Sequence, residues 1–208
     1  MTSFQEFHEE WHEQLRELVR QMNKAARCAT NQEENELYRK LIQRVTSHSK
    51  EYYRVKSLAA KNDVLYVFTA PWSNSLERSL NWISGWRPTT AFHIIYSESG
   101  ILFESHIADI LNGCRNGDLG DLSSNQLSRF SELQCEDSAN EISGSMDAKM
   151  ERLVGILERA DQLRLTTLDN LLQLLTARQA VEFLIAAAHL LFGIRTWGVN
   201  HDRQRSKG

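Results

Sequence analysis

The sequence predicts an all-α fold, a single-domain bundle of about seven to nine helices. Only 2 prolines and 10 glycines occur among 208 residues, so long stretches run without helix breakers. Apolar residues recur every three or four positions, and no convincing alternation with a period of two is found. Five candidate capping boxes mark helix starts, at Ser3/Glu6, Thr30/Glu33, Asn74/Glu77, Ser123/Gln126 and Thr176/Gln179.

The first two expected helices each carry one apolar stripe. The first stripe consists of Phe4, Phe7, Trp11, Leu15, Leu18 and Met22. The second consists of Leu37, Leu41, Val45, His48, Tyr52, Val55 and Ala59. Residues 64–68 form the one strand-like run, and we interpret them as a buried helix end because they directly follow a helical pattern.

The middle of the chain predicts two further helices and a loop. A short helix follows Pro71 and stops at Gly85, with apolar residues Leu76, Leu80 and Ile83. Pro88 suits the first turn of the next helix, whose inward residues are expected to be Phe92, Ile95 and Tyr96. Residues 112–122 are rich in Gly, Asn and Asp and form the clearest loop.

The last part of the chain predicts helices again. Leu127, Phe130 and Leu133 begin one, but the composition of residues 135–148 fits a continued helix or a mobile connector equally well. Three apolar faces follow: Leu153, Ile156, Leu157, Ala160 and Leu163; then Leu168, Leu171, Leu172 and Leu175; then the dense run 179–197. We expect one domain over residues 1–200 and a basic, disordered tail over 201–208.

Charge and composition exclude several classes of function. The formal net charge is −3 and the pI about 6.2, so no basic face for direct nucleic-acid binding is expected. Three isolated cysteines fit neither a disulfide framework nor a zinc site, which indicates a reducing compartment. The start of the sequence lacks a signal-peptide pattern, and the apolar run 183–194 is shorter than the roughly 20 residues that span a bilayer. We expect a soluble protein of the nucleus or cytoplasm.

One motif matches a catalytic pattern. His8, Glu9 and His12 fit H-E-x-x-H, in which two histidines one turn apart bind zinc and the glutamate acts as general base. The apolar stripe places both histidines beside a buried seam rather than in a cleft, and no third histidine follows at the extended spacing. Zinc hydrolysis is therefore kept only as a remote alternative.

A cluster of tryptophans and arginines is the stronger functional signal. Three of the five tryptophans lie within residues 72–86, close to Arg78 and Arg87. Large rings at a chain corner can simply fill the core. Trp and Arg also dominate the energetics of protein interfaces. We expect a partner-binding surface formed by Trp72, Arg78, Trp86 and Arg87.

Two sites near the end of the sequence leave alternatives open. Asp161 and Arg164 are three residues apart, which predicts a weak exposed ion pair, or a costly buried pair that specifies orientation. His189 lies on the densely apolar last helix, where a core histidine is the usual reading. A haem or metal ligand is the weaker one, because the positions one turn away, Ile185 and Gly193, cannot ligate.

Taken in this order, these segments resemble the delay-of-germination domain of plants. This domain occurs alone in seed-dormancy regulators and as the C-terminal part of TGACG-binding leucine-zipper transcription factors. The matching segments are Phe7 with Trp11, Pro71-Trp72 with Leu76-Glu77, Trp82 to Pro88, Leu122-Ser123 with Gln126-Leu127, Ala160 to Arg164 with Thr167-Leu168, and Leu175-Thr176 onward to Trp197. The resemblance covers nearly the whole chain.

The resemblance implies a non-enzymatic helical regulator of seed dormancy, germination or transcription that acts through protein partners. Candidate partners are phosphatases of hormone signalling and transcription co-regulators, and a homo-oligomer is possible. We expect that no basic region or leucine heptads precede the domain. The two histidines that the family associates with haem correspond to Leu191 and Arg195, so haem binding is not carried over and no cofactor is expected. A ligand or haem sensor using His189 remains the alternative.

Overall fold

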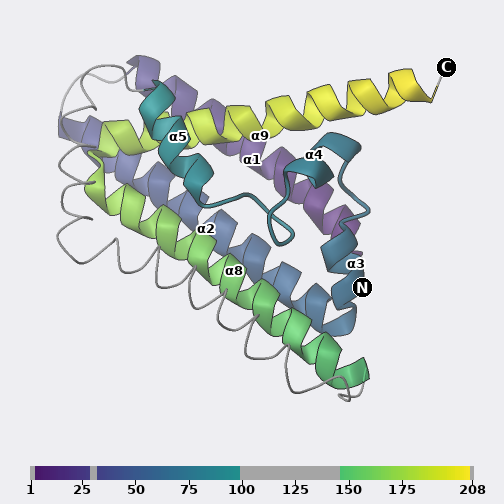
Figure 1. The fold of residues 1–208 in the computed structure, drawn as a ribbon. Coiled ribbons are helices and arrows are strands. Elements are labelled where there is room, and N and C mark those ends of the chain that lie inside the picture. Colours follow the sequence, from purple (N-terminus) through teal and green to yellow (C-terminus); the bar gives the residue numbers. More distant parts are fainter. Residues whose placement is uncertain (1–2, 29–31, 99–145, 207–208) are drawn as a thin grey trace. The chain divides into compact units, whose positions relative to one another are not determined.

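The computed structural model describes residues 3–28, 32–98 and 146–206, and within these ranges it contains helices and no strand (Figure 1). The helices are α1 (Phe4–Cys28), α2 (Gln32–Asn62), α3 (Val64–Thr69), α4 (Ser75–Leu80), α5 (Thr89–Glu98), α8 (Met146–Leu174) and α9 (Ala177–Arg205). The predicted all-α class is confirmed. The predicted loop at 112–122, the boxes beginning at Thr30 and Ser123, and nearly all of 135–148 lie outside the described residues.

The chain divides into two compact units. The single domain expected over residues 1–200 stays a prediction. The first unit comprises residues 1–94 and 151–208. It contains α1 to α4, all of α9, and most of α5 and α8. The second comprises residues 95–150, of which the structure describes only 95–98 and 146–150. Apart from the burial of Ile95 and Tyr96 at the end of α5, the structural features described below belong to the first unit.

The core of the first unit forms where α1, α2 and α9 pack on one another. α1 and α2 run antiparallel, because Trp11 Nε1 donates to the carbonyl oxygen of His48 (3.0 Å) while Gln21 contacts Arg44 farther along. Phe192 of α9 lies beside His12, with ring centroids 6.3 Å apart. Apolar side chains from all three helices fill this core, among them Leu15, Met22, Val45, Val181 and Leu184.

Hydrogen bonds at the helix ends explain where four helices begin. Ser3 and Glu6 bond reciprocally at the start of α1, and full capping boxes at Asn74 and Thr176 open α4 and α9. Three of the five predicted boxes are therefore confirmed. The strand-like run is helical as interpreted: Asp63 caps a separate α3, in which Val64 and Val67 are buried.

The burial pattern differs from the prediction in α1, α2 and α5. In α1, His8 and His12 are buried while Phe7 and Trp11 are only half-buried. In α2, the inward positions near both ends fall one residue later than expected: Tyr38 and Lys56 are buried, Leu37 is exposed and Val55 half-buried. Of the three residues expected inward in α5, only Ile95 is buried; Phe92 and Tyr96 are exposed.

The predicted disordered tail is helical as far as Arg205, because Asp202 holds this end of α9 against α4. The Ser75 backbone N–H donates to Asp202 Oδ2 (2.9 Å) and the Ser75 hydroxyl donates to Asp202 Oδ1. By length and composition α9 is also the one described helix that could cross a membrane, a test that core helices of soluble proteins pass as well. In this structure α9 packs on α1, α2 and α4.

Two glycines of α9 differ in what surrounds them, which gives a matched test of this packing. A Cβ atom built on Gly198 would overlap the side-chain amide of Asn74, whereas one on Gly193 meets nothing within 4 Å. Gly198→Ala should lower the free energy of unfolding by about 1–3 kcal/mol through overpacking. Gly193→Ala should raise it by up to about 1 kcal/mol, because alanine favours the helix. Urea denaturation compares the two; equal effects would contradict the α4–α9 contact.

Candidate protein-interaction surface

α4 and its flanking loops, residues 70–88, link α3 to α5 and carry all four predicted interaction residues. α4 contains no buried residue. Six residues are far too few for a helix to be stable alone in water, so contacts at its ends must hold this segment in place. We call residues 70–88 the bridging segment.

The first half of the bridging segment is bound to α9 by polar contacts. Asn74 Nδ2 donates to the Arg195 carbonyl oxygen (3.2 Å), and Arg195 Nη1 lies 3.5 Å from Glu77 Oε1. Together with the two bonds from Ser75 to Asp202, these contacts fix the start of α4 on the last turns of α9. The close approach is possible because residue 198 is a glycine.

The second half of the bridging segment is held by two fully buried cations. Arg164 of α8 donates to the carbonyl oxygens of Trp82, Ile83 (3.0 Å) and Trp86 (2.8 Å). Lys56 Nζ of α2 donates to the Ser84 carbonyl oxygen (2.6 Å). Carbonyls of four residues between 82 and 86 are thus satisfied by cations from helices far away in sequence.

These contacts maintain an unfavourable backbone. Ile83 and Ser84 adopt left-handed conformations (φ 46° and 56°), which are rare for residues other than glycine and especially so for a β-branched one. Each costs on the order of 1–3 kcal/mol and persists only where the surroundings over-determine it. Gly85, the next residue, allows the close approach of Arg164, because a Cβ at position 85 would lie 2.8 Å from Arg164 Cζ.

Asp161 is the counter-ion of both cations. Its Oδ1 accepts from Lys56 Nζ (3.0 Å) and from Arg164 Nη1, while its buried Oδ2 has no hydrogen-bond partner. One carboxylate therefore faces two cations, and the loop carbonyls supply the remaining negative potential. Burial lowers the pKa of Lys56 to about 8, against the opposing attraction of Asp161. Burial likewise raises the pKa of Asp161. Of the two alternatives for the Asp161/Arg164 pair, the buried one holds.

The predicted surface residues separate into two kinds. Arg78 and Arg87 are exposed; Arg78 also donates to the Ser73 carbonyl oxygen (2.7 Å). Trp72 and Trp86 are half-buried. Trp72 packs edge-on against Phe4 (4.6 Å between centroids), and Trp86 Nε1 donates to the Tyr53 hydroxyl (2.8 Å). The two tryptophans thus attach the bridging segment to α1 and α2, and the two arginines face solvent.

The His8 and His12 rings meet edge-to-face in the α1–α9 interface, with centroids 4.5 Å apart. Arg195 Nη1 donates to His8 Nε2 (3.3 Å), so His8 must carry its proton on Nδ1, beside the Tyr52 hydroxyl (3.4 Å). His12 Nδ1 is buried without a partner. Glu9 is exposed, and the described residues contain no group of three His, Cys, Asp or Glu side chains that could hold a metal ion.

Both rings resist protonation. Burial, and next the charge of Arg195, lowers the pKa of His8 to about 3. Burial, followed by the charge of His8, lowers the pKa of His12 to about 2. The two histidines therefore act as neutral core residues. The sequence pattern placed them beside the buried seam and did not predict their burial.

His189, the remaining candidate for a haem or metal ligand, lies on α9. His189 is exposed, so the reading as a core histidine is wrong. Arg195 contacts His8 and Glu77. It is one of the two positions that correspond to the haem-associated histidines of the family. Its neighbour in that comparison, Leu191, is half-buried.

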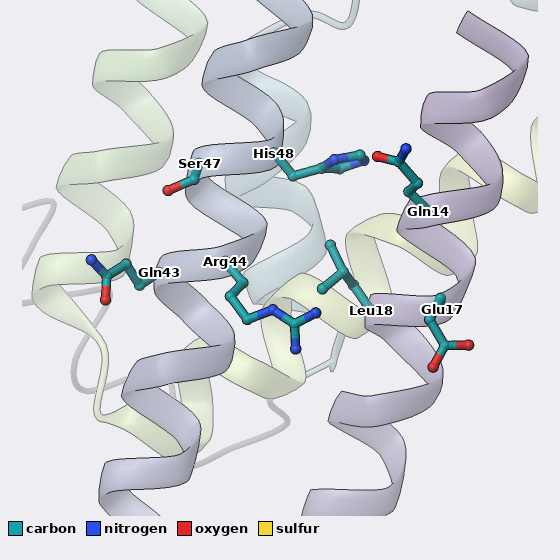
Figure 2. Close-up of a pocket in the computed structure, with 7 residues that line it drawn as sticks. All are labelled: Gln14, Glu17, Leu18, Gln43, Arg44, Ser47 and His48. Carbon is teal, nitrogen blue, oxygen red and sulfur yellow. The ribbon is translucent and has the colours of Figure 1, made fainter. Parts of the chain in front are cut away.

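An open pocket of about 600 Å³ lies between α1 and α2 (Figure 2). It is lined by Gln14, Glu17, Leu18, Gln43, Arg44, Ser47 and His48. Ser47 and His48 leave α2 in opposite directions, so they do not form a serine–histidine pair (Figure 2). His48 instead stacks on Trp11 (4.7 Å between centroids) and donates from Nε2 to the Trp11 carbonyl oxygen (3.0 Å).

Sequence reasoning missed Lys56, Tyr53 and Asp202, each of which holds the bridging segment. A lysine within an otherwise apolar helix face was the available signal for Lys56, because it occupies the inward register of α2. Asp202 gave no such signal, since it falls in the region expected to be a tail.

The sequence is similar to known plant proteins. The family model described as DOG1, seed dormancy control, matches residues 12–97. Protein DOG1-like 4 of Arabidopsis thaliana is 30% identical over 185 residues, which cover 79% of this chain and 79% of the relative. The chain belongs to the DOG1 family. The matched region contains α2, the bridging segment and most of α1 and α5.

Some of the similar proteins are longer. Transcription factor TGA1 of Arabidopsis thaliana is 28% identical over 184 residues, and the chain spans about half (48%) of its length. The TGACG-sequence-specific DNA-binding protein TGA-2.1 of Nicotiana tabacum is 30% identical, and the chain spans 36% of it. These DOG1 relatives are regulators and transcription factors, not enzymes. They support a role in plant dormancy or transcription control.

Removal of the shared counter-ion should destabilise the protein strongly. Asp161→Asn leaves Lys56 and Arg164 buried without an anion, and we expect a loss of about 3–5 kcal/mol in the free energy of unfolding. The matched control is Glu158→Gln on the same helix, whose carboxylate pairs with Lys61 at the surface and should cost less than about 1 kcal/mol. Urea unfolding measures both, and similar losses would contradict a central role for Asp161.

The buried histidines predict acid sensitivity. Their folded pKa values lie below the unfolded value of 6.5, so the unfolded chain binds protons first as the pH falls. Stability is then lost from about pH 6.5 downward, by up to about 1.4 kcal/mol per pH unit and histidine. Between about pH 7 and pH 5, the free energy of unfolding of His12→Phe should fall by about 1–2 kcal/mol less than that of the wild type. His189→Gln at the surface is the control; an unchanged slope in His12→Phe would refute this assignment.

Proposed function

We propose that the chain is a non-enzymatic plant regulator of the DOG1 family that acts in seed dormancy, germination or transcription control by binding a protein partner. The outer side of the bridging segment is its contact surface, with Arg78 and Arg87 as principal contact residues. A phosphatase of hormone signalling or a transcription co-regulator in the nucleus or cytoplasm is the expected class of partner.

The observation that carries this proposal is that the bridging segment is fixed at both ends while α4 itself has no buried residue. Asp202 and Arg195 hold one end, and Lys56 and Arg164 hold the other. A preorganised surface loses little conformational entropy when it binds. Exposed arginines on such a surface are typical of interface hot spots. Leu80, 54% exposed at the end of α4, adds apolar area.

The alternatives have less support. A haem or ligand sensor would need an enclosed ligand site, and His189 is exposed and does not line the pocket of Figure 2. A zinc hydrolase would need accessible ligands, and His8 and His12 are buried. The DNA-binding activity in the name of TGA-2.1 belongs to that longer protein, and the net charge of −3 does not favour it for this chain.

Affinity capture from imbibed-seed extract tests the proposal, with the wild-type chain and Arg78→Ala/Arg87→Ala as baits. Mass spectrometry identifies the captured proteins, and the partner is then purified for direct titration. Because loss of even one hot-spot arginine costs about 2 kcal/mol of binding free energy, the double variant should bind at least about thirtyfold more weakly.

The matched control is Arg39→Ala/Arg159→Ala, which removes two exposed arginines elsewhere and should bind like the wild type. Circular dichroism confirms that each variant is folded. Equal affinity of both double variants for the purified partner would refute the assignment of the surface, and failure to capture any specific partner would refute the proposed function.

A further inference from the structure

Ser206 caps the C-terminal end of α9 and bonds back to the residue that fixes the start of α4. Its backbone N–H (3.1 Å) and its hydroxyl (2.9 Å) both donate to the Asp202 carbonyl oxygen. The side-chain carboxylate of Asp202 in turn accepts from the backbone N–H and the hydroxyl of Ser75. A chemical change at Ser206 therefore reaches the bridging segment through a single residue.

The residues before Ser206 have the charge pattern that basophilic protein kinases select. These kinases recognise an arginine three residues before the target serine, and Arg203 occupies that position. Arg205 adds a second positive charge directly before the serine. All three side chains are exposed, so a kinase can reach them in the folded protein.

Two other serines among the described residues share this arginine spacing but not this location. Ser47 follows Arg44 and Ser57 follows Arg54, and both serines lie well inside α2. A protein kinase binds the residues around its target serine as an extended peptide, so a serine inside a helix becomes accessible only after local unfolding. Helix ends fray readily. The location of Ser206 at the end of α9 therefore distinguishes it from the other two.

A phosphate on Ser206 would disrupt the last turn of α9 for three reasons. The modified side chain has lost the proton that it donates to the Asp202 carbonyl oxygen. The phosphate brings about 1.5 to 2 negative charges to the C-terminal end of the helix, where the helix dipole is already negative. The Asp202 carboxylate, one turn away, repels the phosphate as well. An exposed ion pair with Arg203 offsets little of this repulsion.

We propose that Ser206 is a phosphorylation site for a basophilic protein kinase, and that its phosphate releases the start of α4 from the end of α9. In the reaction, Ser206 Oγ bonds to the γ-phosphorus of ATP while the bond from that phosphorus to ADP breaks. ADP leaves, and the hydroxyl proton passes to a base of the kinase. After release, the contacts of Asn74 and Glu77 with Arg195 alone hold this end of the bridging segment on α9.

The modification and its effect on α4 do not depend on the proposed partner. An effect on partner binding rests on the proposed function, because it requires that the bridging segment is the contact surface. The two experiments below need no partner, so their failure is distinguishable from failure of the proposed function.

Phosphate mapping tests the site. The full chain is incubated with imbibed-seed extract and ATP, and mass spectrometry measures the phosphate on each serine. Ser206 should be phosphorylated, and Arg203→Gln should lower its phosphorylation at least about tenfold. The matched control is Arg178→Gln, which alters an exposed arginine at the start of the same helix and should have no effect. Absence of phosphate on Ser206, or an undiminished level in Arg203→Gln, would overturn the site. Stronger phosphorylation of Ser47 or Ser57 would do the same.

Amide hydrogen exchange tests the effect on α4. Phosphoserine is incorporated at position 206 by stop-codon suppression, and NMR compares the modified chain with the unmodified one. Because the Ser75 N–H donates to Asp202 Oδ2, its exchange should become at least about tenfold faster. Asp202→Ala removes the acceptor and should give a similar increase.

The matched internal control is the Gln179 amide, which donates to Thr176 at the opposite end of α9 and should keep its exchange rate. An unchanged rate at Ser75 in the phosphorylated chain would overturn the proposed release. A slower rate would overturn it too, because the phosphate would then strengthen the contact between α4 and α9.

Discussion

Asp161 is the one group on which the arrangement of three separate segments depends. Its carboxylate pairs with both Lys56 of α2 and Arg164 of α8, and these two cations bind four carbonyl oxygens of the loop, those of residues 82, 83, 84 and 86. A buried ion pair adds little net stability, because desolvation offsets most of the attraction. Its importance here is geometric: it holds both cations beside the loop carbonyls that they bind.

The network also explains why the two sequence blocks that carry the family resemblance occur together. The Trp82-to-Pro88 block supplies carbonyl oxygens and the glycine that permits close approach, and the Asp161-to-Arg164 block supplies the charges. Left-handed Ile83 and Ser84 are tolerated because the cations hold the loop in that conformation.

The sequence predicted the helices well because helix signals are local. Capping boxes and apolar spacing act within a few residues, and the boxes at Ser3, Asn74 and Thr176 form as expected. Burial of polar residues was predicted poorly, as with His8, His12 and Lys56. Their burial depends on partners such as Arg195 and Asp161, which lie 187 and 105 residues away and leave no trace in a local pattern.

The candidate site was predicted in part. Arg78 and Arg87 were expected at the surface and are exposed, whereas Trp72 and Trp86 are half-buried supports. Composition identified the cluster, but it does not distinguish a ring that binds a partner from one that holds the loop. That distinction rests on the Phe4 and Tyr53 contacts, which come from α1 and α2.

The contact between His8 and Arg195 has a consequence for synthesis of the chain on the ribosome. The two residues are 187 positions apart, and translation at about 5–20 residues per second separates their appearance by roughly 10–40 seconds. During that interval the histidine face of α1 has no α9 to cover it. Nascent chains therefore expose an aromatic surface until the last helix emerges, which makes chaperone binding or slow codons before α9 relevant to the yield of folded protein.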